Sequence, residues 1–329
     1  MGLMKSITEV DRALIVGSME YVPADQVAQV RQSSIIHPWT MADQGGGKWR
    51  ACHDYSCGTN RYVRSAPFGL PEVWDAAKVV GPDSHFAKYD IRDGFWHCAI
   101  SEGSRHRLVL RHPGNGRLVW ATRLPFGYVD SPRLFCAVTE AIAQAVRARA
   151  AKAGVGVHVF VFVDDYLVIG DTEELTRLGC DWLEEELHRR GVEWAPHIST
   201  ERPCRCLEFL GLVLCNFEGC RRVTVSRKRL DNTRRDLSEW LMRAPADLGE
   251  AEVQPQELAK FKLLGRLVFF SQVVRGGRTY MQGMLSSFQG LVVDWRRHRV
   301  RPASGQGWKA MRVGGAFWRD LQCRPLELC

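Results

Sequence analysis

Residues 157–169 read Val-His-Val-Phe-Val-Phe-Val-Asp-Asp-Tyr-Leu-Val-Ile, a β-branched and aromatic run that two aspartates interrupt. Two apolar strands joined by two turn residues predict a β-hairpin with Asp164 and Asp165 at its tip. The apolar residues on both sides of the aspartates predict that both faces of the hairpin are covered. Aspartate is an ordinary turn residue, so Asp164 and Asp165 taken alone favour a structural role.

A third aspartate favours a functional role of these carboxylates more strongly than the pair alone does. His85–Ile91 predicts a short strand that ends in a carboxylate, Asp90. If this strand neighbours the hairpin in one sheet, three carboxylates converge, repel one another and lose solvation. A divalent cation offsets that cost, and Mg²⁺ prefers carboxylate and phosphate oxygens. Two such ions about 4 Å apart would suit in-line displacement at phosphorus.

The surrounding patterns alternate between strands and helices. After the strand with Asp90 we expect a hairpin over 108–121, a helix capped by Ser131 and ended by Gly154, the hairpin with the two aspartates, a helix capped by Thr172 and ended by Gly191, and a strand pair over 207–225. This order predicts an α+β fold whose centre is an antiparallel sheet backed by helices.

The charge balance favours a polyanion as partner. The chain has 45 Lys and Arg against 37 Asp and Glu, a net charge of +8. A solubilising surface is the alternative. The sequence from Ser226 onward is helical and basic, and the 221–243 segment has a surplus of Arg and Lys, for which a solvated helix face is the alternative to a binding surface.

Neither a signal-peptide pattern nor an apolar run of about 18 residues occurs, so we expect no membrane span and no secretion. An intracellular location, in the nucleus or the cytoplasm, follows. Eleven scattered cysteines then predict reduced, buried thiols. A metal site at Cys204, Cys206, Cys215 and Cys220 is a weaker alternative, because their spacing is not that of a zinc ribbon.

Five segments, in order along the chain, resemble motifs of reverse transcriptases of the retrotransposon type. They are a fingers segment (Trp49–Tyr55, with Asn60), the first catalytic motif (Asp90–Phe95), a loop-and-helix motif (Leu124–Pro132), the aromatic-x-Asp-Asp signature (Phe162–Asp165) and a primer-grip hairpin (Phe209–Leu212). Leu264–Leu267 and Gly276–Arg278 further resemble the thumb of LTR or DIRS-like retrotransposon enzymes.

The resemblance implies roles for particular residues. Asp90, Asp164 and Asp165 match the catalytic carboxylates that hold two Mg²⁺ ions, with Mn²⁺ as a substitute. The residues implied to contact the incoming deoxynucleotide are Arg50, Lys48, Ile91, Phe95, Phe126 and Gly127. Phe95 matches a steric gate against the ribose 2′-hydroxyl, with core packing as the alternative. Lys48 could equally be a surface lysine with no part in nucleotide binding.

The implied fold is a right hand with fingers, palm and a helical thumb. We expect an N-terminal extension and fingers over 1–88, a palm over 89–215 that includes part of the fingers at about 101–125, a grip end and thumb over 216–295, and a basic tail over 296–329. The implied function is RNA-directed DNA polymerase, acting on an RNA or DNA template, a primer duplex and dNTPs. A decayed copy that only binds nucleic acid is the main alternative. An RNA-directed RNA polymerase is a third, which Phe95 disfavours.

Two departures from the family's pattern bear on activity. The lysine that many relatives use to protonate pyrophosphate falls near Ile198, where the adjacent His197 is a candidate general acid or a plain surface residue. No second cluster of spaced carboxylates follows residue 250, so we expect no RNase H site in this sequence. We therefore expect a fragment, a truncated element copy, or a reading frame that lost its partners.

Overall fold

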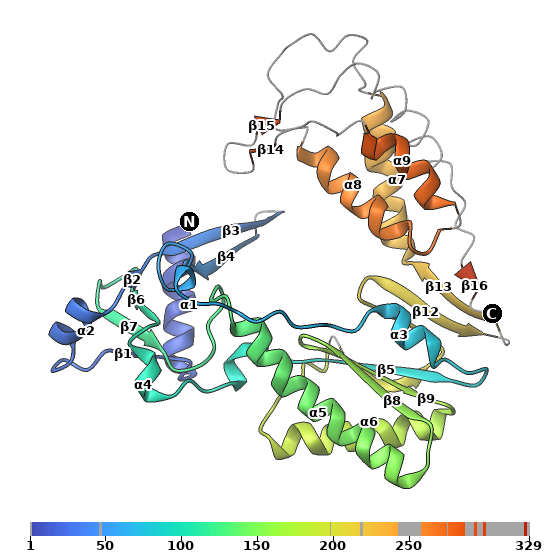
Figure 1. Cartoon of the computed structure of the whole chain (residues 1–329), viewed down its shortest axis with the longest axis horizontal. Helices are drawn as coiled ribbons and strands as arrows, with labels where there is room; N and C mark the ends of the chain where they lie inside the picture. Colours follow the sequence, from blue (N-terminus) through green and yellow to red (C-terminus); the bar gives the residue numbers. More distant parts are fainter. Residues whose placement is uncertain are drawn as a thin grey trace. The chain divides into compact units, whose positions relative to one another are not determined.

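Figure 1 shows the computed structural model of the chain. The structure describes residues 2–45, 48–197, 199–217, 220–242, 258–274, 276–286, 293–294, 299–300 and 326–327. The chain divides into two compact units: Met1–Glu72 with Phe86–Pro203, and Val73–His85 with Cys204–Cys329. The domain boundaries expected from the sequence stay predictions, and most of the expected basic tail lies outside the described residues.

The N-terminal part of the first unit packs a helix against a small sheet. Helix α1 (Gly2–Ile15) is followed by a four-stranded sheet in the order β1 (Met19–Tyr21), β7 (Leu118–Ala121), β6 (Val109–Arg111), β2 (Ile36–His37). Strands β6 and β7 pair antiparallel, which confirms the hairpin expected over 108–121. Val10 of α1 joins Leu110 and Val119 in one buried core.

Shorter elements complete this part of the unit. They are α2 (Val27–Ser33), the antiparallel pair β3 (Trp39–Gly45) and β4 (Lys48–His53), η1 (Thr59–Arg61), η2 (Gly94–His97) and α4 (Glu102–Arg105).

A second sheet of the first unit carries the aspartates. Its order is β10 (Thr200–Cys204), β5 (His85–Asp90), β9 (Asp165–Gly170), β8 (Val157–Phe162). Helices α5 (Ser131–Ala153) and α6 (Glu173–Arg189) contact strands β8 and β9 and each other (Figure 1). Their shared core contains Tyr89, Ile142, Val159, Val168 and Leu183. The expected sheet backed by helices is therefore confirmed.

The hairpin with the aspartates turns one residue earlier than expected. Phe162 pairs with Asp165, so the turn residues are Val163 and Asp164, and Asp165 opens strand β9. Val163 adopts a left-handed φ of 61°, which a β-branched residue rarely does. Strand β9 is buried almost throughout, as expected, whereas β8 alternates between buried and half-buried residues, so one of its two faces is only partly covered.

The helix ends follow capping chemistry, with one correction. Thr172 caps α6 by accepting a hydrogen bond from the Leu175 N–H at 3.3 Å, and Gly154 ends α5 with a left-handed φ of 68°. Ser131 is not the N-cap of α5, because Asp130 occupies that position. The Ser131 hydroxyl instead donates to the Pro125 carbonyl oxygen at 2.8 Å and so fixes the preceding loop.

The second unit combines one sheet with helices. The sheet runs β11 (Cys206–Phe209), β12 (Leu212–Phe217), β13 (Cys220–Val225), β16 (Leu326–Glu327), so the expected strand pair over 207–225 is three strands. The helices are α3 (Val73–Lys78), α7 (Arg227–Met242), α8 (Leu258–Phe270) and α9 (Gly277–Ser286), and two short strands, β14 (Val293–Asp294) and β15 (Arg299–Val300), pair with each other. Asn216 is buried and donates to the carbonyl oxygens of Gly81, Pro82 and Ser84.

The cysteines depart from expectation in two ways: one pair is joined by a disulfide, and of the thiols in the described ranges only Cys136 and Cys180 are buried, while Cys57 is exposed. Cys206 and Cys215 face each other across β11 and β12 with their Cα atoms 4.2 Å apart, and a disulfide joins them. Opposed residues of an antiparallel pair are close enough for such a bond. The other cysteines of the described ranges are in no disulfide. As for membranes, the helices that the structure describes include none that combines the length and the hydropathy of a bilayer span.

Candidate active site

The backbone brings Asp90 and the Val163-Asp164 turn together. The Ile91 N–H donates to the Asp164 carbonyl oxygen at 2.9 Å, which ties the end of β5 to the hairpin tip. On the other side of Asp90, its N–H donates to the Ser199 hydroxyl oxygen at 3.1 Å, and its carbonyl accepts from the Ala195 N–H at 2.8 Å. Two neighbouring segments thus hold Asp90 in place.

The three carboxylates influence one another. Burial raises the pKa of Asp164, and the charges of Asp165 and Asp90 raise it further, while a backbone hydrogen bond opposes them. Burial likewise raises the pKa of Asp90, and Asp165 adds to that rise. Crowded, partly desolvated carboxylates of this kind are stabilised by a cation.

A cation that the sequence patterns did not single out lies at the site. The Lys88 Nζ is 2.9 Å from Oδ1 of Asp165, and both side chains are largely buried. Side chains two residues apart on a strand share a face, so Lys88 and Asp90 of β5 point the same way. That spacing is the sequence signal that could have found Lys88.

The donor atoms suit a hard divalent cation. All three groups offer carboxylate oxygens, the ligands that Mg²⁺ prefers, and Oδ1 of Asp165 is buried with no partner of hydrogen-bond geometry. As the side chains stand, no three His, Cys, Asp or Glu residues within the described ranges are gathered closely enough to hold an ion. The assignment of Asp90, Asp164 and Asp165 as metal ligands therefore stays a prediction.

Phe95 lies in an aromatic cluster with Phe126 and Phe135. Its ring centroid is 5.2 Å from that of Phe126 and 5.3 Å from that of Phe135. A Cβ on the preceding Gly94 would approach Phe135 to 2.6 Å, so glycine is required there for the chain to pass. The half-buried Phe95 ring is thus fixed by its neighbours, which suits both a gate and plain packing.

The loop with Phe126 and Gly127 is anchored to the fingers segment. Gly127 has a φ of 94°, and a Cβ there would lie 2.1 Å from the carbonyl oxygen of His53. The Asn60 amide donates to the Gly127 carbonyl at 2.9 Å and accepts from the Val129 N–H at 3.0 Å. Position 127 therefore requires glycine because the loop passes close to the backbone of β4.

For most of the remaining predicted site residues, the structure gives the position of the backbone. Ile91 is buried and bridges to Trp194. Arg50 and Lys48 lie on β4, opposite Ala42 and Gly45, and their side chains lie outside the described part of the structure. His197 is exposed, and its charge lowers the pKa of Asp90, so it lies near the site. Ile198 lies outside the described residues.

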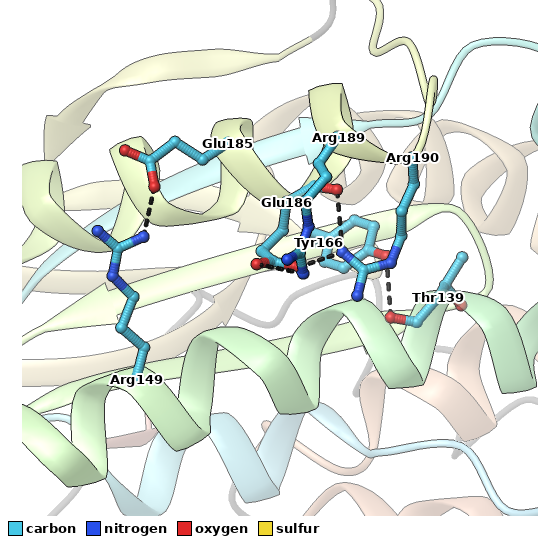
Figure 2. A network of polar contacts seen from close by, with 7 residues as sticks. All are labelled: Thr139, Arg149, Tyr166, Glu185, Glu186, Arg189 and Arg190. Carbon is cyan, nitrogen blue, oxygen red and sulfur yellow. Dashed lines mark hydrogen bonds and ion pairs between the residues drawn. The ribbon is translucent and has the colours of Figure 1, made fainter.

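Polar contacts link strand β9 to α5, and α5 to α6, as Figure 2 shows. Tyr166 follows Asp165, and its buried hydroxyl donates to the Thr139 carbonyl oxygen of α5 at 2.9 Å. Arg149 of α5 pairs with Glu185 of α6, and Glu186 pairs with Arg189 and Arg190 at the end of α6 (Figure 2). The residue after the aspartates therefore connects them to the helical layer.

The predicted grip hairpin is a tight turn in the second unit. Leu210 and Gly211 have left-handed φ values of 50° and 80°. A Cβ on Gly211 would lie 2.4 Å from the Arg229 guanidinium, which also approaches Glu208 at 3.2 Å. Arg229 of α7 thus covers the turn between β11 and β12.

Comparison with known proteins places these features in a family. The family model "Reverse transcriptase (RNA-dependent DNA polymerase)" matches residues 43–214, which include the three aspartates. A retrovirus-related Pol polyprotein from transposon 412 of Drosophila melanogaster is 30% identical over 127 residues, which are 39% of this chain and 9% of that protein. Polyprotein P3 of Commelina yellow mottle virus is 27% identical over 145 residues, 44% of this chain and 7% of that protein.

Solved structures agree on the fold. A foamy viral protease-reverse transcriptase in complex with double-stranded DNA superposes with a TM-score of 0.68 at 16% identity, covering 95% of this chain and 47% of the other. A second foamy viral structure, in complex with an RNA/DNA hybrid, gives a TM-score of 0.61 at 15% identity, over 96% of this chain and 37% of the other. The chain spans under a tenth of the two polyproteins and less than half of these viral chains.

The predicted right-hand fold of a reverse transcriptase is therefore confirmed, as is the resemblance to the retrotransposon type, while the choice between LTR and DIRS-like stays a prediction. The matched segment covers more than half of the chain and contains the ordered motifs and the sheet that carries the aspartates. The chain belongs to the reverse transcriptase family.

Proposed function

We propose that this chain is the polymerase core of an RNA-directed DNA polymerase that extends a primer 3′-hydroxyl with dNTPs. The observation that carries the proposal is the hydrogen bond from Ile91 to Asp164, which brings Asp90 to the hairpin with Asp164 and Asp165. The pKa values of Asp90 and Asp164 are raised, first by burial and then by the charge of Asp165, which supports three crowded carboxylates at this point. Nucleotidyl transfer needs such a site, because charge builds up on the phosphoryl oxygens.

Asp90, Asp164 and Asp165 would hold two Mg²⁺ ions, with Mn²⁺ able to replace them. When bound, such ions lower the pKa of the primer hydroxyl and neutralise the leaving pyrophosphate. The chain's own task is to keep the carboxylates in place. The Asp164 carbonyl oxygen accepts a hydrogen bond from the Ile91 N–H. Asp165 is followed by Tyr166, whose hydroxyl donates a hydrogen bond to α5 and so fixes this part of the strand.

The nucleotide would contact the residues that match the family's nucleotide site. Phe95 would close the space beside the sugar, because Phe126 and Phe135 fix its ring. The loop of Phe126 and Gly127, with the Ile91 backbone, would border the base and sugar. Arg50 and Lys48 of β4 would meet the triphosphate, where a guanidinium can donate paired hydrogen bonds.

The partners we propose are an RNA or DNA template and a primer duplex. The foamy viral proteins of similar fold were solved with double-stranded DNA and with an RNA/DNA hybrid, which supports this class of partner. Exposed cations of α7, such as Arg227 and Lys228, would add affinity for phosphates without reading sequence. Because templates and dNTPs are intracellular, we also propose a location in the nucleus or the cytoplasm.

Primer extension on an RNA template tests the proposal. With Mg²⁺ and dNTPs we expect extension by the full chain, and a loss of at least ~10³-fold in rate for Asp164→Asn, with duplex affinity unchanged in an electrophoretic shift assay. Asp171→Asn, directly after the far end of β9, is the matched control and should extend like the wild type. Duplex binding without extension under Mg²⁺ or Mn²⁺ would support the decayed, binding-only alternative. Equal rates for wild type and Asp164→Asn would overturn the metal assignment.

Sugar selectivity tests Phe95 separately. Phe95→Val should raise incorporation of ribonucleotides relative to deoxynucleotides by about tenfold or more, because the ring no longer meets the 2′-hydroxyl. Phe95→Tyr keeps the ring and should keep the selectivity. An unchanged ratio in Phe95→Val would leave Phe95 a packing residue.

A further inference from the structure

Lys88 is the cation built into the carboxylate cluster. Its Nζ lies 2.9 Å from Oδ1 of Asp165, and the side chains of Lys88 and Asp165 are 17% and 23% exposed. The ammonium and the carboxylate are thus mostly withdrawn from water. Attraction between such groups is screened much less than between surface charges.

We propose that Lys88 is a positioning residue that holds Asp165 in an ion pair and thereby keeps the affinity of the empty site for divalent cations low. This inference rests on the proposed function, since it takes the three aspartates as the metal site. Lys88 touches none of the reacting atoms and acts through Asp165.

Two observations support this role. First, the ion pair occupies a carboxylate oxygen that has no hydrogen-bond partner, so a metal that uses this oxygen has to displace Lys88. Second, Lys88 lies near the other carboxylates as well, because its charge lowers the pKa of both Asp90 and Asp164. One ammonium therefore offsets the repulsion among all three aspartates when no metal is bound.

The consequence concerns the order of binding. A divalent ion that uses Asp165 has to break the ion pair with Lys88 first, so the metal-free site binds it weakly. A nucleoside triphosphate adds several negative charges and brings its own cation. Metal binding at the carboxylates then becomes more favourable than the ion pair between Lys88 and Asp165. Lys88 would make the site take up metal together with the nucleotide instead of before it.

Binding of Mn²⁺ to the full chain without nucleotide, followed by electron paramagnetic resonance of the free ion, tests this without reference to activity. Lys88→Met keeps the length of the side chain and removes its charge. We expect it to bind Mn²⁺ about tenfold more tightly than the wild type. Lys88→Arg keeps the charge and should stay within about threefold. Lys152→Met, an exposed lysine in the last turn of α5, is the matched control and should not change the affinity.

A second pair of variants shows whether Lys88 acts through Asp165. In an Asp165→Asn background, Lys88→Met should tighten Mn²⁺ binding by less than about threefold, since the ion pair is already gone. Folding is checked by the thermal midpoint in EDTA. We expect Lys88→Met to unfold at a lower temperature there and to recover when Mn²⁺ is added, because the metal replaces the missing charge.

The outcomes separate the inference from the proposed function. If Asp90→Asn abolishes Mn²⁺ binding while Lys88→Met binds as the wild type does or more weakly, the metal site stands and the role of Lys88 is refuted. An equal tightening in the wild-type and Asp165→Asn backgrounds also refutes it. Binding of Mn²⁺ that survives Asp90→Asn refutes both the metal assignment and the inference built on it.

Discussion

The β8–β9 hairpin and the β11–β12 hairpin both have two-residue turns but are held in different ways. Both turns place a non-glycine residue at a left-handed φ, Val163 at 61° and Leu210 at 50°. The β11–β12 turn continues with Gly211, which accepts such a backbone easily, and is covered by the flexible end of Arg229. The β8–β9 turn has no glycine and ends in Asp164.

The difference lies in what each hairpin contacts. A Cβ on Gly170, at the end of β9, would lie 2.3 Å from the backbone nitrogen of Thr176, so α6 approaches this strand directly. The β8–β9 hairpin is therefore packed against the backbone of α6 at the end opposite its turn, whereas the β11–β12 turn is covered by the Arg229 side chain. A site that must hold three carboxylates against repulsion needs the first kind of support.

Gly170→Ala should have the largest effect on stability, about 2–4 kcal/mol, because neither β9 nor the backbone of α6 can yield. The free energy of unfolding from urea titration measures it. Gly103→Ala, where a Cβ meets nothing within 4 Å, is the control and should change little. Similar values for the two variants would show that α6 does not press on β9.

Tyr166→Phe should cost about 1–2 kcal/mol, because the Thr139 carbonyl loses a buried donor. We also expect slower primer extension with unchanged duplex affinity, since the residue next to Asp165 loses its anchor on α5. Tyr62→Phe, on an exposed side chain, is the control for a lost hydroxyl. A fully active, equally stable Tyr166→Phe would show that this hydrogen bond does not position Asp165.

Gly211→Ala should cost only about 1 kcal/mol, the ordinary penalty for a side chain at left-handed φ, because the Arg229 guanidinium can move aside. Gly191→Ala has a similar φ of 66° with open space around it and should cost the same. Urea titration of both variants gives the comparison. A loss several times larger at Gly211 would mean that Arg229 is as rigid as the contact at Gly170.

Val163→Gly should have the smallest effect, within about 1 kcal/mol of the wild type in either direction. Relief of the left-handed φ of 61° is offset by lost packing and by greater freedom of the unfolded chain. Val161→Gly, at a buried position of β8, should cost well over 2 kcal/mol in the same titration. Equal losses at 161 and 163 would argue that the turn is not strained.

Much of the first unit could be predicted from local patterns. The hairpin over 108–121, the helix ended by Gly154 and the cap at Thr172 depend on neighbours within a few residues, and the structure has all three. The turn of the β8–β9 hairpin was misplaced by one residue. Its register depends on pairing with β5 and on packing against α5, and no local propensity would choose Val163 for a left-handed position.

Contacts between distant segments were beyond the sequence patterns. Lys88 was visible as a lysine on a strand, but its partner Asp165 comes from another strand. Gly127 was expected to make room for a nucleotide, and in the structure the room it makes is for the His53 carbonyl. The pair Cys206 and Cys215 became a disulfide only because β11 and β12 place the two residues opposite each other.

The sequence by itself determined the order of the elements, the aspartates at the ends of apolar strands and the family, because periodicity, turn chemistry and motif order are properties of short segments. The tertiary structure alone decided which residue forms the turn, which carboxylate Lys88 holds and which backbone each glycine meets. These depend on how sheet and helices pack, since an ion pair or a close approach between remote segments exists only once the whole unit has folded.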